Sequence, residues 1–321
     1  MALQTRNRFI TVNIARDTMP STVDGTLPTT LLFVGADMPH EYFDNATDAV
    51  SALEGLSTED NDLSVAINVI KNMFAQEHHP KIGVMGVSTE ESISTVLEAE
   101  EPFVDSYRIV TSGTTEVGRD LIAEYVKGKA LFYYVNFDDV DEYEAFVTAN
   151  EDNDNVVGFV HDREGQNLAA AAASLASGNF FGDWWMEFKN LVGISPNTFT
   201  KRENDKILEN NGTVYIREAR RNLLTGSKVV SGEYVDIVET EHYLVDEIIK
   251  KMFSILSTTK KIPYTQKGID LFEGGLRNVL DLATDRGVLA TDENDNPVYK
   301  VSTPLRTEIN TEYIKNRVLP D

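Results

Sequence analysis

The spacing of apolar and polar positions predicts a layered α/β structure over the middle of the chain. Short apolar runs alternate with longer stretches whose apolar positions recur at helical spacing. Such alternation is typical of an open sheet whose strands are joined by helical crossover connections. The predicted strands span residues 30–35, 81–87, 107–110, 130–137 and 156–161, and the predicted helices span residues 63–76, 90–99, 116–127, 140–149 and 167–176.

The N-terminal region has a different pattern. Residues 8–15 alternate apolar and polar side chains, which predicts a strand, and the turn-rich stretch 17–28 separates this strand from the next one. Because a strand of this kind is not stable alone in water, we expect it to pair with the edge of a sheet. The linker would allow that edge to belong to the same chain or to another subunit.

After residue 178 the pattern indicates a smaller α+β part. An irregular stretch leads to a strand at 212–217 and a hairpin at 220–236 that turns at 224–226. Helices at 242–256 and 268–286, a strand at 298–302 and a polar tail follow. We therefore predict an N-terminal extended arm at 1–28, an α/β domain at 29–178 and an α+β domain at 179–321, so that the fold is α/β and α+β.

Composition excludes several classes of protein. The 321 residues include no cysteine, which excludes disulfides, thiolate metal sites and cysteine nucleophiles. No apolar stretch is long enough to span a membrane, and the N-terminus does not have the pattern of a signal peptide. We therefore expect a soluble protein made in a cytoplasm.

The net charge of −23 argues against nucleic-acid binding, because it would repel a phosphate backbone. This charge is unevenly placed: residues 1–160 carry 9 basic and 28 acidic side chains, whereas residues 161–321 carry 20 and 24. One explanation is a solvated acidic surface on the first half. The other is that the two halves face different surroundings.

Two places in the α/β layer could carry chemistry. The sequence has neither G-x-G-x-x-G nor G-x-x-x-x-G-K-[ST], and the nearest phosphate-binding candidate is the TSGTTE segment around Gly113, which has no lysine. His161 and Asp162 at a strand end are a candidate catalytic pair, but no G-x-S-x-G nucleophile elbow accompanies them. An α/β enzyme or nucleotide-binding protein that uses Gly113, His161 and Asp162 is therefore the alternative function.

The remaining candidates have structural explanations. The five histidines lack metal-ligand spacing, and His78 and His79 lie where they would complement a helix end. The acidic run that begins at Asp292 meets Pro297 where a calcium loop needs glycine. The aromatic pair Trp184 and Trp185 is expected in the core or at a subunit interface. We predict no catalytic residue, no metal and no cofactor.

The later part of the chain resembles a known family. The run FKNLVGISPNTFTKRENDKILENNGTVYIRE (188–218) is similar to a K-x-L-x-G element and an apolar-Thr step that lead to a helix, a turn and a strand. The segment from GEYVDIVE at 232 is similar to a G-x-x-I-D strand, a helix, a lysine-isoleucine-proline-tyrosine turn and a second helix. These features, in this order over residues 188–301, resemble the contractile phage tail sheath protein family, and residues 30–87 resemble it more loosely.

The resemblance implies a structural subunit and not an enzyme. Such a subunit polymerises as hexameric rings in a helical sheath around a tail tube, and it contracts by repacking of linked subunits. Its partners would be other copies of itself, the tail tube protein, and baseplate and tail terminator proteins, with no nucleic acid and no membrane. It would belong to a virion tail or a phage-derived contractile particle that is assembled in the bacterial host cytoplasm.

The resemblance also implies extended terminal arms that add strands to the sheet of a neighbour, with the α/β part outside. Family members usually continue past the position that matches residues 318–320, so we expect a shorter terminal arm here or a cut chain. The residues expected in inter-subunit strand pairing are Phe9, Ile10, Thr11, Val12, Asn13, Ile14, Val298, Tyr299, Lys300 and Val301. The basic residues expected to face the tube are Lys250, Lys251, Lys260, Lys261, Lys267 and Arg277.

Overall fold

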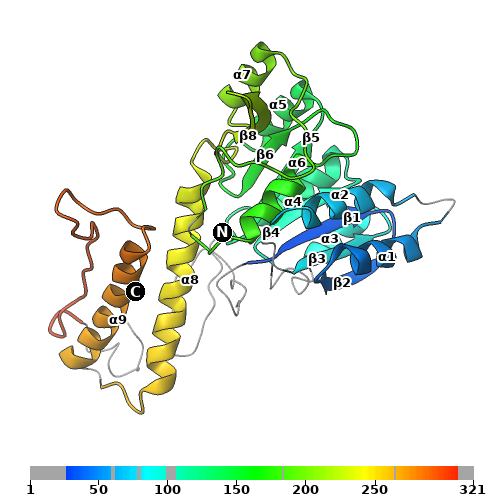
Figure 1. Ribbon diagram of the computed structural model, residues 1–321. Helices are drawn as coiled ribbons and strands as arrows, with labels where there is room; N and C mark the ends of the chain where they lie inside the picture. Colours follow the sequence, from blue (N-terminus) through cyan, green and yellow to red (C-terminus); the bar gives the residue numbers. More distant parts are fainter. Residues whose placement is uncertain are drawn as a thin grey trace. The chain divides into compact units, whose positions relative to one another are not determined.

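The computed structural model describes residues 27–58, 62–77, 81–98, 106–182, 184–263 and 265–309 (Figure 1). These residues form two compact units, of which the first ends at Val238 and the second begins at Glu239. The predicted strand that contains Phe9 to Ile14 lies outside the described residues, as do His78 and His79. The predicted domain boundaries at residues 28 and 178 stay predictions.

A six-stranded sheet forms the centre of the first unit. Its order is β2-β3-β1-β4-β5-β6, and all of these strands run parallel except β2, which is antiparallel to β3. The strands span Thr29–Val34 (β1), Met38–Phe43 (β2), Ile82–Val87 (β3), Arg108–Ser112 (β4), Phe132–Phe137 (β5) and Val156–Val160 (β6). The five predicted strands of the α/β layer are therefore confirmed, with shifts of one or two residues at their ends.

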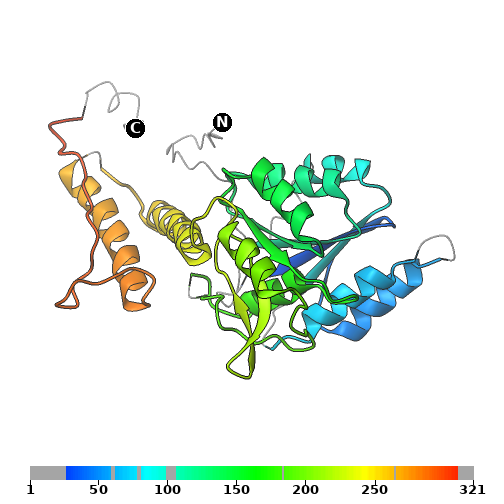
Figure 2. The same cartoon turned by 90° about the horizontal axis from the view of Figure 1, so that it is seen from above.

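Helices cover both faces of this sheet (Figures 1 and 2). On one face α2 (Ser64–Phe74) contacts both α1 (Ala46–Leu56) and α6 (Leu168–Ser177). On the other face lie α3 (Glu91–Glu98), α4 (Glu116–Val126) and α5 (Val140–Ala149), as right-handed crossovers between the parallel strands require. Burial on both faces explains why β3, β5 and β6 are largely apolar runs, whereas β4 also buries Arg108, Thr111 and Ser112.

The alanine run of α6 brings this helix close to the sheet. Ala169 to Ala173 are all buried, and α6 contacts four of the parallel strands, β1, β4, β5 and β6. Ser174 and Ser177 are also buried on this helix, where their hydroxyl groups donate to the backbone oxygens of Met73 and Ala173. Small side chains allow this close approach, and the buried hydroxyl groups keep hydrogen-bond partners.

Residues 179–238 belong to the first unit and extend its sheet beyond β6. The helix α7 (Lys201–Glu209) begins at a capping box in which Thr200 and Glu203 bond reciprocally. The strands β7 (Val214–Glu218) and β8 (Arg221–Thr225) then form an antiparallel hairpin, and Thr213 pairs with Phe159 of β6. The predicted hairpin at 220–236 is wrong, because the observed turn lies at Ala219 and Arg220, and residues from Val235 onward are helical.

The second unit is built on two long helices that pack side by side. α8 (Val235–Thr258) starts at the end of the first unit, and α9 (Gln266–Asp285) runs antiparallel to it. Arg286 donates to the Tyr243 hydroxyl at 2.8 Å, and Lys251 donates to Asn278 at 2.9 Å. At Gly275 a Cβ atom would lie 2.5 Å from the Cδ1 atom of Ile255, so glycine permits this close approach.

The predicted strand at 298–302 is wrong for the described chain. Val298 to Ser302 have no strand assignment there, although the chain on either side of the preceding turn forms an isolated bridge between Thr291 and Pro297. The Tyr299 hydroxyl donates to Asp281 on α9 at 2.5 Å, and this bond fixes the segment alongside that helix. Pairing of Val298, Tyr299, Lys300 and Val301 with another subunit stays a prediction.

Candidate functional site

A pocket of about 440 Å³ opens at the carboxyl end of the parallel strands. It is lined by residues that follow β4, β5 and β6, where doubly wound sheets bind ligands. Gly113 and Gly165 have φ values of 73° and 70°, which favour glycine, and they let the chain leave each strand in a sharp turn. The predicted candidates Gly113, His161 and Asp162 all line this pocket, as the shared direction of the strands requires.

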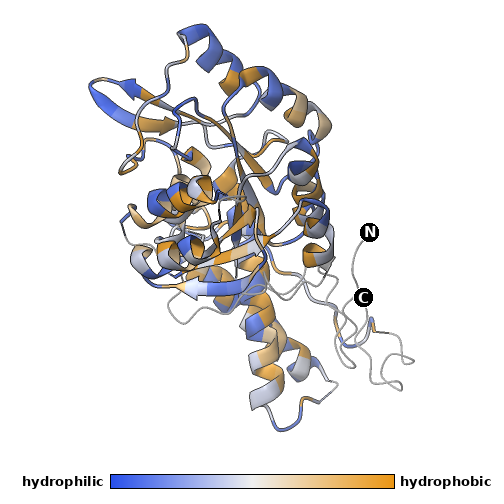
Figure 3. Ribbon diagram, turned by 90° about the vertical axis from the view of Figure 1, so that its right-hand side faces the viewer, coloured by the Kyte–Doolittle hydropathy of each residue, from blue (hydrophilic) through white to orange (hydrophobic). Residues whose placement is uncertain are grey.

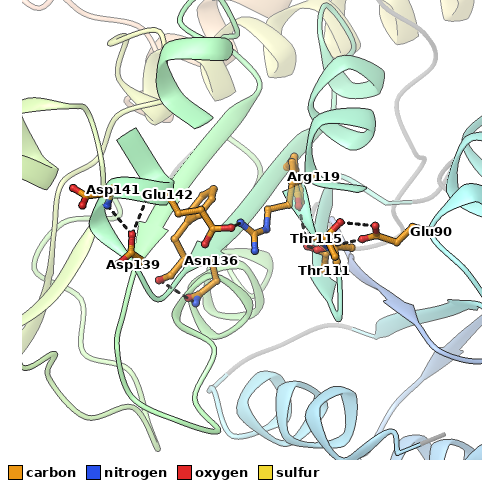
Figure 4. A network of polar contacts seen from close by, with 11 residues as sticks. Glu90, Thr111, Thr115, Arg119, Asn136, Asp139, Asp141 and Glu142 are labelled. Carbon is orange, nitrogen blue, oxygen red and sulfur yellow. Dashed lines mark hydrogen bonds and ion pairs between the residues drawn. The ribbon is translucent and has the colours of Figure 1, made fainter. Parts of the chain in front are cut away.

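The N-terminus of α4 is occupied by a carboxylate of the chain itself (Figure 4). Thr115 is the N-cap residue but makes no capping bond with its own side chain. Instead its backbone N–H donates to Glu90 Oε1, and its hydroxyl donates to Glu90 Oε2 at 2.5 Å. Glu90 therefore takes the place that a phosphate group takes at such helix ends.

Side chains of the protein also accept hydrogen bonds from the backbone N–H groups at the start of the next two helices, α5 and α6. Asp139 accepts bonds from the backbone N–H groups of Asp141 and Glu142 at the start of α5, both at 2.9 Å. At the start of α6, Asn136 accepts from the N–H of Leu168 at 3.0 Å, and Asn167 caps the same turn. An anion would have to displace these oxygens before it could use the helix N-termini around the pocket.

His161 and Asp162 hold the chain in place and do not form a catalytic pair in this geometry. The His161 side chain is 1% exposed, and its Nε2 atom lies 2.8 Å from the backbone oxygen of Ser195, to which it donates. Burial lowers the pKa of His161 and so favours the neutral ring. Asp162 accepts from the backbone N–H of Thr198 at 2.9 Å and from its hydroxyl, so both residues anchor residues 195–198 to the end of β6.

The pKa of Asp162 lies below its usual value. Partial burial raises it, but the two bonds from Thr198 outweigh this effect because they favour the charged carboxylate. Beside this pair, the Arg163 Nε atom donates to the backbone oxygen of Pro196 at 2.8 Å. Three consecutive side chains after β6 thus bind one loop, which is a structural role.

Of the two arginines that line the pocket, Arg119 is paired within the chain. Arg119 on α4 donates to Glu142 on α5 at 2.5 Å, and its guanidinium lies over the ring of Phe137, 4.7 Å from the centroid (Figure 4). Its side chain is only 14% exposed. This partly buried pair joins two helices of one layer, and it leaves little of the arginine free to bind a ligand.

Within the described residues, no group of three or more His, Asp and Glu side chains could hold a metal ion. No helix in that part of the chain is long and apolar enough to cross a membrane. The two tryptophans of the aromatic pair lie in different environments. Trp184 is buried, whereas Trp185 is 41% exposed and stacks on Tyr234, with ring centroids 6.5 Å apart. Its place in a subunit interface stays a prediction.

The six basic residues that were expected to face a tube fall into two groups. Three have partners in the second unit: Lys250 pairs with Asp246 and Glu247, Lys251 donates to Asn278, and Arg277 pairs with Glu273. The other three, Lys260, Lys261 and Lys267, are exposed at the turn between α8 and α9, and among the described residues none of them forms an ion pair. No contact with a tube is tested here.

One basic cluster was missed at the sequence level. The tip of the β7–β8 hairpin carries Arg217, Arg220 and Arg221, which line a pocket of about 560 Å³ together with Phe188. The signal was present in the sequence as three arginines within five positions, IREARRN. It was hidden because the hairpin turn was placed seven residues later, around Gly226.

No family model and no curated protein matches this chain. Solved structures do match its fold. A chain of the anti-feeding prophage (AFP) baseplate, determined by cryo-EM with 6-fold symmetry, is 12% identical, with a TM-score of 0.64 over 87% of this chain and 83% of that chain. A chain of the PVC sheath complex, an extracellular contractile injection system in the contracted state, is 13% identical, with a TM-score of 0.64 over 93% of this chain and 87% of that chain. At this level of identity the likeness shows the fold.

Proposed function

We propose that this chain is a structural subunit of a contractile particle, and specifically of its sheath. The observation that carries the proposal is the match of 93% of the chain to a chain of a sheath complex. The ordered motifs of residues 188–301 support the same conclusion independently of the fold. The subunits would stack as hexameric rings around a tail tube and contract by repacking of linked copies.

The closed pocket supports a structural role over the alternative of a nucleotide-binding protein or enzyme. Glu90, Asp139 and Asn136 occupy the helix N-termini where a doubly wound sheet would bind phosphate. His161 and Asp162 are engaged with a loop. No cofactor is part of the proposal.

The proposal is tested by expressing the chain together with a tail tube protein from the same source. Negative-stain microscopy should show tubes that are covered by the chain. In the complete particle its partners would be other copies of itself, the tail tube protein, and baseplate and tail terminator proteins. The match to a chain of a baseplate structure favours a second candidate function, in which the chain belongs to the baseplate at one end of such a particle. Short rings that never extend along the tube would support that position, and a small oligomer in the presence of the tube protein would refute both.

The tube-facing part of the proposal rests on Lys260, Lys261 and Lys267, which are exposed and have no ion pair among the described residues. Reversal of charge at Lys260 and Lys261 should weaken binding to the tube and flatten its salt dependence. The matched control is reversal at Lys201 and Arg202, which are exposed on α7 and are not among the residues expected to face the tube. Equal tube binding by the Lys260→Glu, Lys261→Glu variant and the unchanged chain would reject this role.

A further inference from the structure

The outer part of the β7–β8 hairpin is a cluster of positive charge on an acidic chain. Arg217, Arg220 and Arg221 are all exposed, and Figure 3 shows this end of the hairpin in the hydrophilic colour. In the part of the chain that the structure describes, none of the three guanidinium groups forms an ion pair, although Glu218 stands directly opposite Arg221 in the ladder. We call this surface the arginine tip.

The backbone at the arginine tip is held in an unfavourable conformation. Among the described residues five that are not glycine have positive φ, and two of these are Asn211 and Asp295, which tolerate it. The other three lie at the arginine tip: Phe188 with φ of 63°, Ala219 with 46° and Arg220 with 68°. Such strain is concentrated at functional sites, where it presents side chains that would otherwise point elsewhere.

Phe188 adds an apolar element to the same surface. Its backbone N–H donates to Leu224 of β8 at 2.9 Å, which fixes it beside the hairpin, while its side chain is 67% exposed. Arginines beside an exposed aromatic ring are typical of interface centres. A partner must therefore offer carboxylates, which arginine binds in a bidentate manner, and an apolar side chain next to them.

The exposed face of α4 has these features. Glu116, Asp120 and Glu124 are exposed and follow one another at four-residue spacing, so they lie on one side of the helix, and Val117 beside them is 63% exposed. Like charges at this spacing destabilise a helix unless a cation faces them. Among the described residues none of the three carboxylates forms an ion pair, whereas the acidic residues of α5 pair with Arg119 and Lys206. We call this surface the acidic stripe.

We propose that the arginine tip of one copy binds the acidic stripe of a second copy of this chain. The proposal goes beyond the proposed function, from which it takes only that copies of the chain meet. The two surfaces are different parts of one unit: α4 lies in a helical layer, and the hairpin extends the sheet past β6 (Figure 2). A contact between two different surfaces is heterologous, so repetition produces rings or helical filaments and not a closed pair.

Charge reversal tests the contact directly. One variant carries Arg217→Glu, Arg220→Glu and Arg221→Glu, and the other carries Glu116→Arg, Asp120→Arg and Glu124→Arg. Each alone should associate about tenfold or more weakly at low ionic strength, because like charges then meet. An equimolar mixture should recover association, because each reversed surface then meets a complementary one on the other variant.

The control for this test is Lys71→Glu with Lys201→Glu and Arg202→Glu. It changes the net charge of the chain by the same amount as the arginine-tip variant, on exposed residues of α2 and α7. Sedimentation velocity at low and high salt measures the unchanged chain, the two variants, their mixture and the control. Equal weakening by the control, or no recovery in the mixture, overturns the proposal, and so does nucleic acid that copurifies with the unchanged chain and not with the arginine-tip variant.

A second test uses the absence of cysteine from the sequence. Copies with Arg220→Cys are mixed with copies that carry Asp120→Cys, or with copies that carry Glu151→Cys as the control, and are treated with a short bis-maleimide. Efficient cross-linking to position 120 and not to 151 supports the contact. If tubes form without this cross-link, the proposed contact is wrong but the proposed function stands. If the cross-link forms but the chain does not assemble around the tube protein, the contact stands but the proposed function is wrong.

Discussion

Glu90 binds Thr115 at the N-terminus of α4, beside the pocket at the end of the sheet. Its carboxylate bonds to both the N–H and the hydroxyl of Thr115, so the first turn of α4 has its partner within the chain. The pocket nevertheless keeps the form of a phosphate site, with a glycine turn at Gly113 and a helix behind it. Glu90 is thus one of three side chains, with Asp139 and Asn136, that bind the helix N-termini around this pocket.

Replacing Glu90 by alanine tests this explanation. The variant should lose about 1 kcal/mol of stability, because the cap of α4 is removed. Inorganic phosphate should then raise the melting temperature of Glu90→Ala but not that of the unchanged chain or of Glu91→Ala, at matched ionic strength. Stabilisation of the unchanged chain by phosphate would show that the helix end is open.

His161 should make the stability of the fold depend on pH on the acid side of its ordinary pKa. Its pKa is lowered by burial, so below its ordinary value of about 6.5 the unfolded chain takes up a proton that the folded chain does not. This contribution is complete above the ordinary pKa, and it is lost as the pH falls from that value through the lower pKa of the folded chain. His161→Gln can keep the donor to Ser195, and thermal melts should show a flatter pH dependence for it; an unchanged slope would contradict the prediction.

At the scale of elements, the hairpin has a turn that its sequence does not favour. Two-residue turns with positive φ at both positions prefer Asn-Gly, and here the positions are Ala219 and Arg220. Substituting glycine at either position should raise stability by about 1 kcal/mol, because glycine adopts this backbone without strain.

The two substitutions separate stability from binding. Ala219→Gly keeps all three arginines and should leave self-association unchanged, whereas Arg220→Gly should weaken it while also raising the melting temperature. Chemical denaturation and sedimentation of the same samples measure both effects. A parallel gain or loss of association in both variants would show that the backbone of the turn, and not the Arg220 side chain, governs the contact.

The same unfavourable turn explains why the hairpin was misplaced at the sequence level. Ala-Arg gives no turn signal, so Gly226 was taken as the turn instead. Neither β2 nor α1 was predicted, and β2 gives a weak signal because it is an edge strand that contains Pro39. The buried parallel strands were predictable, because each contains an apolar run, as short as Ile109-Val110 in β4, and these runs alternate with helical patterns.

At the scale of the whole molecule, the order of the strands along the chain could be predicted from the sequence, but the path of the loops and the positions of charged surfaces could not. The convergence of Gly113, His161 and Asp162 on one pocket follows from the parallel strands, so it could be predicted from their order. The bonds that hold these residues could not, because Ser195 and Thr198 lie in a loop whose path no periodicity describes. The arginine tip and acidic stripe lie on separate elements, and only the fold shows that neither forms an ion pair among the described residues.

Assembly is also a property of the whole molecule. We expect changes in the N-terminal residues to affect assembly without affecting folding. The described sheet of the first unit begins at Thr29, and the buried core formed by the described residues of this unit begins at Leu27. Residues 9–14 have the alternation of a strand but lie outside the described residues. If their pairing partner is a neighbouring subunit, the first unit does not need them in order to fold.

Deletion of residues 1–20 should therefore leave a monomer with a nearly unchanged melting temperature that no longer forms tubes with the tube protein. Circular dichroism melts and negative-stain microscopy of the same preparation measure the two properties. As a matched control, a variant with Ile10→Ser, Val12→Ser and Ile14→Ser keeps the length of the chain and removes the apolar positions of the strand, and it should behave in the same way. Unfolding of the shortened chain would show instead that the strand belongs to its own subunit, because a strand lost from its own sheet exposes the apolar surface that it covered.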